Sequence, residues 1–299
     1  MTEYHRPALL QESLEGLAII PNGIYVDLTY GGGGHGNAIL KKLTGGKLIA
    51  FDQDHQAKGN ILEDEQLVFI SHNFRYLSKF LRLKGIKKVD GILGDFGVSS
   101  HQLDTPDRGF SFRFGDAPLD MRMNKSGGQS AETIANTYSS EDLSNMLFQY
   151  GELRRSRKIA DLIVKRRKLV PLRTTGDLIT ALQPLISPNN VKELARVFQA
   201  FRIEVNEELE VIKEVLMQAA KLLKPQGRLV LISYHSLEDR LVKNFIRTGT
   251  FDGKPEKDLF GNFDKPFNAI NKKVIVPSIE EVKANPRARS ARLRIASKI

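Results

Sequence analysis

The sequence has 299 residues, 41% of them hydrophobic and 27% charged, and it contains no cysteine. This length allows one large domain or two, and the composition is typical of a globular protein. The lack of cysteine excludes disulfides, thiolate metal sites and cysteine nucleophiles, and we expect no metal site. We see no leader and no apolar run that could span a membrane, so we expect a cytoplasmic protein without membrane contact.

Charge is the second constraint. The chain has 45 Lys and Arg against 35 Asp and Glu, which gives a net charge of +10. Such a surplus indicates a polyanionic partner, most commonly nucleic acid, although a merely soluble basic protein would carry the same charge. Two segments concentrate it: residues 151–173 hold nine basic and two acidic side chains, and residues 286–299 hold five basic and none acidic.

The first hundred residues alternate strand-like and helix-like patterns. Strands are expected at residues 23–29, 47–51, 66–71 and 88–94, with helices between them at about 35–43, 56–64 and 74–83. This alternation predicts βαβ units in a Rossmann-like, mostly parallel α/β sheet covered on both faces. Ligands of such sheets bind beyond the carboxyl ends of the strands.

After Asp95 the pattern becomes helical, with segments expected at 131–136, 140–150, 153–168 and 175–185. An apolar stripe from Val197 to Ala219 then predicts one long helix, ended by the Pro and Gly of residues 224–227. A fifth strand (228–233), a helix (236–246), a long loop (249–270) and a last strand with Arg292 and Arg294 on one face follow. We therefore expect a core at 1–107 and 203–299, interrupted by a helical insertion at 108–202.

The stretch IYVDLTYGGGGHGNAIL, residues 24–40, contains a glycine loop after the first strand. Gly31, Gly33 and Gly36 form the G-x-G-x-x-G pattern of dinucleotide sites, but Asp27 followed by glycines is also typical of S-adenosylmethionine (AdoMet) methyltransferases. A carboxylate at the strand end would repel a pyrophosphate and suit the positively charged methionine half of AdoMet. In the alternative interpretation, Asp27 only caps a turn.

Three side chains follow the next three strands. Asp52 can accept hydrogen bonds from ribose hydroxyls, which NAD and AdoMet share, so it indicates a nucleoside without choosing one. Phe74 could flank an adenine or pack in the core. Asp95 follows the strand that usually lies nearest the chemistry, with Gly97 leaving room for a flat ligand; alternatively, Asp95 is a turn residue and Ser99 a helix cap.

The segment YHSLEDR, residues 234–240, follows the fifth strand. Ser236 and Asp239 are a plausible capping pair for the next helix. His235 and Arg240 would, however, lie at the carboxyl end of that strand, beside the same crevice. Both interpretations stay open.

Residues 108–123 interleave Phe110, Phe112 and Phe114 with arginines. Such a mixture can stack on bases and hold phosphates, but phenylalanines at period two can also bury one face of a short strand, which we favour. Basic runs are usually solvated faces, yet near a nucleoside site they favour a nucleic-acid track. The candidates for RNA contact are Arg108, Arg113, Lys165, Arg166, Arg167, Lys168, Arg240, Arg292 and Arg294.

Together these motifs resemble the bacterial ribosomal RNA cytidine N4-methyltransferases, the RsmH or MraW family. The resemblance runs from Tyr4 and His5 to residues 285–290, and the matching motifs are YVDLTYGGGGHG, FDQD, DFGVSSHQLD, RGFSFR, PLDMRM, FQAFRIEVNEELE, YHSLEDR and NPRARSARLR. His101 stands where the family usually has proline. The stretches ELRRSRKIA (152–160) and VKELARVFQA (191–200) also differ from the sequences common in the family.

The resemblance implies a Rossmann-like AdoMet-dependent methyltransferase with a helical insertion that recognises RNA. Its substrate would be N4 of a cytidine in the decoding region of small-subunit rRNA, within the assembled or assembling 30S subunit. Carried over by motif, the AdoMet contacts fall on Gly33, Gly34, His35, Asp52, Phe74, Asp95 and Gln102.

The lack of cysteine agrees with an exocyclic target, because methylating C5 of cytosine ordinarily needs a cysteine nucleophile. Asp95 and nearby carbonyls could accept the N4–H bonds, with His235 as a second catalytic candidate; alternatively, the proton leaves to water. Two other functions stay open. An NAD-linked oxidoreductase is opposed by Asp27 and the basic insertion, and an RNA-binding assembly factor would keep the pocket without turnover.

Overall fold

The computed structural model describes residues 7–299, so Tyr4 and His5 lie outside the described residues. The chain divides into two units: one extends to Gly97 and resumes at Leu209–Ile299, and the other is Val98–Glu208. The insertion thus begins at Val98 rather than at 108 and ends at Glu208 rather than at 202. Val98, Leu103 and Val205 account for this difference, because they pack against the insertion's own core.

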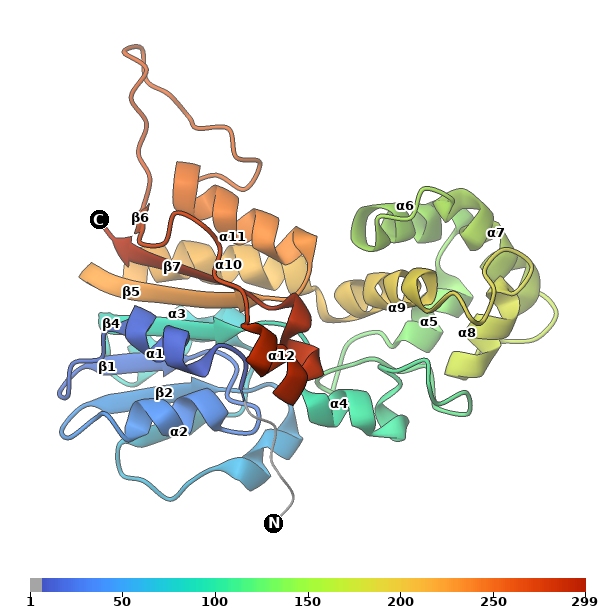
Figure 1. Ribbon diagram of the computed structural model, residues 1–299. Helices are drawn as coiled ribbons and strands as arrows, with labels where there is room; N and C mark the ends of the chain where they lie inside the picture. The colour runs from blue at the N-terminus through green and yellow to red at the C-terminus, as the bar shows by residue number, and fades with distance from the viewer. Residues whose placement is uncertain (1–6) are drawn as a thin grey trace. The chain divides into compact units, whose positions relative to one another are not determined.

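The first unit is built on a seven-stranded sheet in the order β3-β2-β1-β4-β5-β7-β6 (Figure 1). The five parallel strands are β1 (Ile24–Asp27), β2 (Lys47–Phe51), β3 (Leu67–Ile70), β4 (Val89–Asp95) and β5 (Leu223–Ser233). At the other edge, β7 (Arg292–Lys298) runs antiparallel to β5, and β6 (Phe267–Ala269) antiparallel to β7. The expected Rossmann-like, mostly parallel sheet is confirmed, and its strand order reverses between β1 and β4, where such sheets bind ligands.

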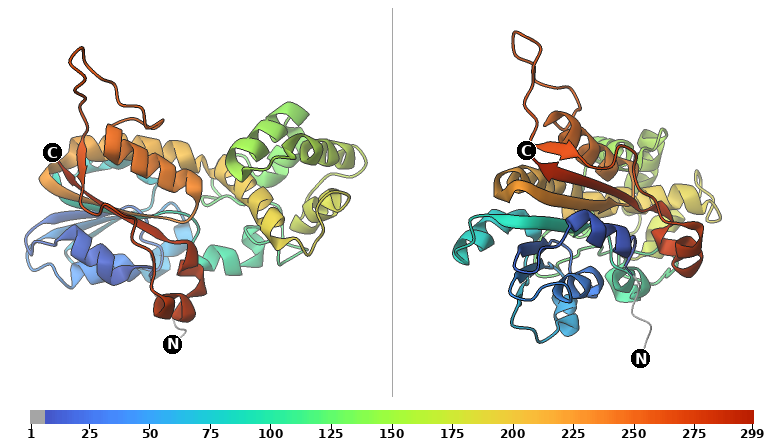
Figure 2. Two further views of the ribbon diagram at one scale, coloured as in Figure 1. Left: turned by 45° about the horizontal axis from the view of Figure 1, so that its top comes forward. Right: turned by 60° about the vertical axis from the view of Figure 1, so that its left-hand side comes forward.

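Helices cover both faces of this sheet (Figures 1 and 2). Successive strand residues alternate between two cores: Val26 belongs to the core with α3 (Leu77–Leu83), α10 (Glu208–Leu222) and α11 (Ser236–Thr248), whereas Tyr25 belongs to the core with α1 (Leu10–Leu17) and α2 (Gly34–Leu40). This alternation is the period-two geometry of a strand buried on both faces. The remaining short elements are η1 (His55–Asn60), η2 (Phe74–Tyr76), α12 (Ile279–Ala284) and η4 (Pro286–Ser290).

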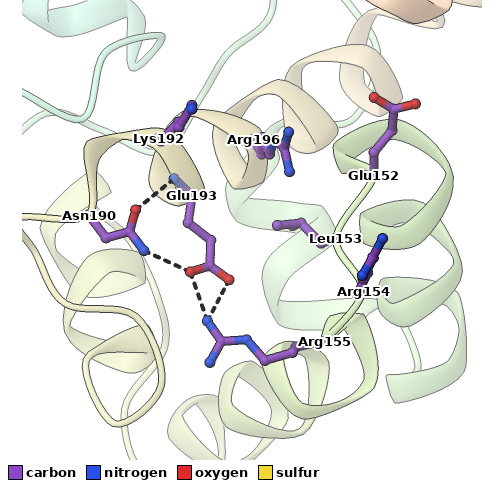
Figure 3. A pocket seen from close by; sticks show the side chains of 8 residues that line it. All are labelled: Glu152, Leu153, Arg154, Arg155, Asn190, Lys192, Glu193 and Arg196. Carbon is purple, nitrogen blue, oxygen red and sulfur yellow. Dashed lines mark hydrogen bonds and ion pairs between the residues drawn. The ribbon is translucent and has the colours of Figure 1, made fainter.

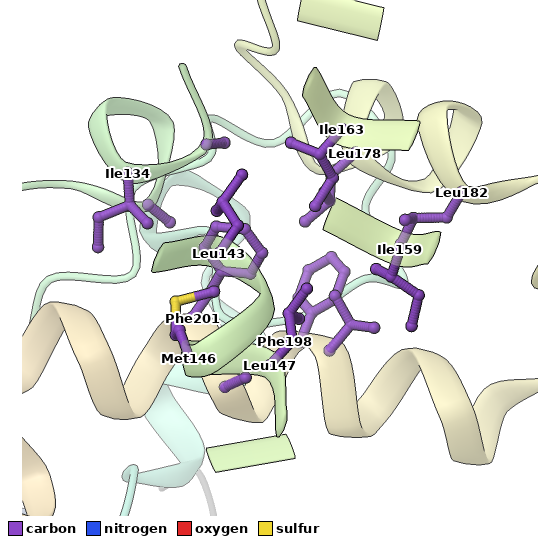
Figure 4. Packing of buried hydrophobic residues seen from close by; sticks show 14 of the residues in the cluster. Ile134, Leu143, Met146, Leu147, Ile159, Ile163, Leu178, Leu182, Phe198 and Phe201 are labelled. Carbon is purple, nitrogen blue, oxygen red and sulfur yellow. The ribbon is translucent and has the colours of Figure 1, made fainter. Parts of the chain in front are cut away.

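The second unit is helical, as expected. Its elements are α4 (Ser100–Asp104), η3 (Pro106–Arg108), α5 (Ala131–Thr137), α6 (Ser140–Gly151), α7 (Ser156–Arg167), α8 (Thr175–Leu182) and α9 (Val191–Asn206). They enclose a separate hydrophobic core that includes Leu143, Leu147, Ile159, Phe198 and Phe201 (Figure 4). Phe110 and Phe112 pack in this core, but residues 108–123 form turns rather than the short strand that we expected.

The prediction of a single long helix from the apolar stripe is wrong. It is two helices, because Glu207 takes a left-handed conformation (φ 50°) between α9 and α10. The stripe runs through the break since each half serves a different core: Phe201 belongs to the insertion core and Leu216 to the sheet core. The stop signal at 224–227 lies inside β5, where its pairing with β4 shifts register.

In the part of the chain that the structure describes, every helix is too short or too polar to cross a membrane.

Candidate active site

The glycine loop joins β1 to α2 and takes backbone conformations that suit glycine. Gly31 and Gly33 have φ angles of 51° and 78°. A Cβ on Gly31 would meet little, its nearest neighbour being the carbonyl oxygen of Thr29 at 3.9 Å, whereas on Gly33 it would come within 2.9 Å of Nδ2 of Asn37. The loop therefore keeps an unobstructed backbone at Gly31, which lets a ligand approach closely.

Asp52 ties the end of β2 to this loop. One carboxylate oxygen accepts the backbone N–H of Gly31 at 2.8 Å, and the other accepts that of Asp54 at 2.8 Å. The residue is only partly buried. Asp52 therefore orders the loop, and its contact with ribose hydroxyls stays a prediction.

Gly34 and His35 pack against the N-terminal segment. A Cβ on Gly34 would lie 2.8 Å from Cγ of Pro7, and Nε2 of the buried His35 ring is 3.1 Å from the carbonyl oxygen of Ala8. Burial lowers the pKa of His35 to about 4, so its ring is neutral at physiological pH. Both residues have a clear structural task here, and their contact with a cofactor stays a prediction.

Phe74 opens η2 after β3 and remains partly exposed. Its ring packs against Phe96 in a tilted arrangement, with 6.0 Å between centroids. Core packing therefore occupies part of the ring, and an adenine would have to use the remainder. Gln102 belongs to the other unit, where it forms a capping box with Ser99, confirming Ser99 as a helix cap.

Asp27 is completely buried. Oδ1 accepts the backbone N–H of Thr29 at 3.0 Å, as in the turn-capping alternative, while Oδ2 has no hydrogen-bond partner among the described residues. Burial, with a smaller effect of the charge of Asp52, raises the pKa of Asp27 to about 7. Asp27 can therefore act on a cofactor through its charge, and its direct contact with one stays a prediction.

Asp95 ends β4 with a side chain 20% exposed. Its backbone N–H donates to Oγ1 of Thr29 at 2.7 Å, and Tyr234 donates a hydrogen bond to its carboxylate. Oδ1 of Asp95 is buried and has no partner among the described residues. Burial raises the pKa of Asp95 to about 7 despite Tyr234, with the charges of Asp27 and Glu238 acting in the same direction.

His235 is the N-cap of α11. Its Nδ1 accepts the N–H of Glu238 at 3.4 Å, and Glu238 in turn accepts the N–H of His235 at 3.3 Å. The capping pair is therefore His235 and Glu238, not Ser236 and Asp239. Because Nδ1 serves the cap and Nε2 lies 3.2 Å from Oε1 of Glu238, the structure favours a structural role for His235 over a catalytic one.

Several arginines proposed for RNA contact are engaged within the protein. Arg108 is buried and donates to the carbonyls of Arg122 and Met123 at 3.2 and 3.0 Å. Arg294 forms a two-point ion pair with Asp239 at 2.6 and 3.0 Å, and Arg292 contacts the same carboxylate at 3.4 Å. Asp239 therefore serves the tail strand, which is why it does not cap α11.

The other basic candidates differ in exposure. Arg113 is 58% exposed and pairs with Asp104 at 3.3 Å. On α7 and just beyond it, Lys165 and Lys168 are exposed, whereas Arg167 is partly buried and donates to the carbonyl of Ala135 at 2.8 Å. Arg166 is also partly buried, and Arg240 is exposed on α11.

The sequence analysis missed Tyr234 and Thr29, which hold Asp95 from two sides. Tyr234 directly follows β5 and Thr29 lies two residues after the end of β1, so both occupy the strand-end positions where ligands bind. Their position at strand ends was the signal that could have identified them. Aromatic and β-branched residues are, however, common in strands, so their residue types alone did not indicate a role in the site.

The first unit brings most of the predicted cofactor residues to adjacent strand ends: the glycine loop follows β1, Asp52 follows β2, Phe74 follows β3 and Asp95 ends β4. An unobstructed glycine backbone at Gly31, a carboxylate at the end of β2 and a partly exposed carboxylate at the end of β4 fit a cationic nucleoside such as AdoMet. Gln102 belongs to the other unit, and its contact with the cofactor stays a prediction.

Comparisons with known proteins agree with this fit. The family model described as the MraW methylase family matches residues 2–299. A protein of Bacteroides thetaiotaomicron named ribosomal RNA small subunit methyltransferase H is 54% identical over 99% of this chain and 97% of its own. One of the same name from Christiangramia forsetii is 54% identical over 100% of this chain and 99% of its own.

A solved structure of an rRNA methylase from Streptococcus thermophilus covers 99% of each chain, with 13% identity and a TM-score of 0.43, a likeness too low to bear on the assignment. The assignment depends on the family model and on the relatives of high identity. The chain belongs to the MraW methylase family and is an AdoMet-dependent methyltransferase.

Proposed function

We propose that this protein transfers the methyl group of AdoMet to N4 of a cytidine in the decoding region of small-subunit rRNA. The family and the relatives named ribosomal RNA small subunit methyltransferase H support an rRNA substrate. The observation that carries the chemistry is Asp95, a partly exposed carboxylate at the end of β4, next to the strand that leads into the glycine loop.

The cofactor would be held mainly by the first unit. Asp52 would accept from the ribose, the backbone at Gly31 would allow close approach, and the exposed part of Phe74 would flank the base. Buried Asp27 would add a negative charge that favours a cation. When bound, AdoMet supplies an electrophilic methyl group on a sulfonium centre.

The target amine is weakly nucleophilic because its lone pair is delocalised into the ring. The enzyme must therefore position it and accept its N–H bonds. Asp95 is suited to this because Thr29 fixes its backbone, Tyr234 fixes its carboxylate, and its side chain is 20% exposed at the end of β4. An exocyclic target also agrees with a chain that has no cysteine.

The substrate particle would be small-subunit rRNA within the assembled or assembling 30S subunit, which places the enzyme in the cytoplasm. The net charge of +10 supports an RNA partner. The insertion, with the basic run of residues 165–168 at the end of α7, would contact the RNA.

Mass spectrometry of rRNA nucleosides tests the proposal. We expect N4-methylated cytidine to fall in a strain from which the gene is deleted and to return with the wild-type gene. A strain complemented with Asp95→Ala distinguishes an enzyme from an assembly factor without turnover. The amount of N4-methylcytidine should stay lowered if this protein is the enzyme, whereas an assembly factor should restore it. Unchanged N4-methylcytidine in the deletion strain contradicts the proposal.

A further inference from the structure

The insertion contains a basic pocket of about 370 Å³ outside the sheet unit (Figure 3). It lies between the α6–α7 connection and the start of α9. Its walls are Glu152, Leu153, Arg154, Arg155, Asn190, Lys192, Glu193 and Arg196. Four cations against two carboxylates leave a local surplus of two positive charges.

Close packing of two helices creates the pocket. At the end of α6, a Cβ on Gly151 would lie 2.9 Å from the carbonyl oxygen of Arg196, so glycine lets α6 approach α9. Glu152 then takes a left-handed conformation (φ 50°) that ends α6, and the next residue, Leu153, is buried. Arg154 and Arg155 follow this anchor and come to lie opposite the first turns of α9.

One of the four cations is neutralised inside the pocket. Arg155 contacts both oxygens of Glu193 at 2.7 and 2.8 Å, and Asn190 donates to the same carboxylate at 2.9 Å. Asn190 also caps α9 by accepting the N–H of Glu193. This network fixes the pocket wall and leaves Glu193 little capacity to bind other cations.

The other three cations are exposed and have no acidic partner among the described residues: Arg154, Lys192 and Arg196. Lys192 and Arg196 are four residues apart on α9, so they share one face of the helix. The N-terminal end of this 16-residue helix adds further positive potential. In contrast, Arg108, Arg122 and Arg294 have bonds within the protein.

We infer that this pocket binds a backbone phosphate of the rRNA substrate and anchors the RNA on the insertion. Guanidinium groups bind phosphate through paired N–H bonds, and an ammonium adds a point charge, so two arginines and a lysine around one cavity suit a phosphodiester. A volume of about 370 Å³ has room for a phosphate with an adjoining sugar. The inference rests on the proposed function for the identity of the RNA.

The test compares two double variants that remove equal charge. Arg154→Gln with Arg196→Gln changes the pocket, and Arg157→Gln with Lys158→Gln changes exposed residues of α7 outside it. Binding of a small-subunit rRNA fragment is measured over a salt series. We expect the pocket variant to bind at least about tenfold more weakly and to lower the slope of log affinity against log salt by about 0.7 per lost contact. The α7 variant should lose much less, and AdoMet affinity should change in neither.

A pair of charge-preserving changes, Arg154→Lys with Arg196→Lys, should keep the wild-type salt slope. Equal losses in the pocket and α7 variants would overturn the inference, since they would indicate non-specific attraction. The inference would also be overturned if the pocket variant bound the RNA as tightly as the wild type. This holds even if inorganic phosphate or an acidic peptide raised the Tm of the wild type and not that of the pocket variant. If the wild-type protein binds the RNA through the pocket but does not methylate it, the proposed function is contradicted and the inferred phosphate site is retained.

Discussion

Nδ1 of His35 lies 3.8 Å from Oδ2 of Asp95, while Nε2 of the same ring is 3.1 Å from the carbonyl oxygen of Ala8. A carbonyl can only accept, so Nε2 carries the proton and the lone pair of Nδ1 is directed toward Asp95. With its pKa lowered to about 4 by burial, His35 offers Asp95 no positive charge at neutral pH. Asp95 is therefore held by Tyr234 and Thr29, and burial keeps its pKa near 7.

The first prediction is that Asp95→Ala lowers the single-turnover methylation rate by about 10²-fold, the low end for a positioned acid–base group. Saturating AdoMet is required, because Asp95 is also a predicted cofactor contact. Asp95→Asn keeps an acceptor oxygen and should retain more activity than Asp95→Ala. RNA affinity should be nearly unchanged in both.

The pH dependence gives a control for this assignment. The wild-type rate should rise with pH through about 7, where Asp95 loses its proton, and the profile of Asp95→Asn should lack that step. A wild-type rate for Asp95→Ala would show that Asp95 has no catalytic role. Tyr234 would then be the next residue to replace, since His235 caps α11.

A second prediction concerns stability and Asp27. Its pKa is about 7 in the fold and 3.8 as the reference for an unfolded chain, so the folded state binds the extra proton. The stability that this protonation contributes is complete below about pH 4 and is lost as pH rises through about 7. The free energy of unfolding of wild type, relative to Asp27→Asn, should therefore fall between about pH 4 and about pH 7 and stay level above about pH 8.

Urea unfolding of the protein without cofactor measures this difference. Asparagine keeps an acceptor for the N–H of Thr29, so the comparison isolates the charge. His35 titrates with the opposite sign but is present in both proteins, and its effect cancels. Parallel pH profiles for the two proteins would mean that Asp27 is ionised throughout this range.

Asp52→Ala is predicted to weaken AdoMet binding by about 1.5–3 kcal/mol, the value of hydrogen bonds to a charged acceptor. Part of this loss would come from the glycine loop, because Asp52 also accepts the N–H groups of Gly31 and Asp54. Asp52→Asn separates the two contributions, since it keeps acceptor capacity but not the charge. Calorimetry should also detect no NAD binding; comparable NAD affinity, or full AdoMet affinity in Asp52→Ala, would contradict the assigned site.

Local rules predicted the sheet, the glycine loop and Asp52, because strand alternation and strand-end positions depend on neighbours in sequence. These rules could not predict the helix break at Glu207, since a single left-handed residue leaves the three- and four-residue spacing of the apolar side chains unchanged. The pairing of Arg294 with Asp239 joins residues 55 positions apart, and no local pattern reveals it. The cap at His235 was missed because histidine is not a usual N-cap residue.

The last prediction revises the role of the basic run that ends α7. Replacing Lys165, Arg166, Arg167 and Lys168 together would disturb the fold as well as the charge, because Arg167 donates to the carbonyl of Ala135 and Arg166 is partly buried. The cleaner change is Lys165→Gln with Lys168→Gln, since both side chains are exposed. If they contact single-stranded RNA, the salt slope should fall by about 0.7 per contact, with AdoMet affinity and Tm unchanged. An unchanged slope would assign this run to a solvated face.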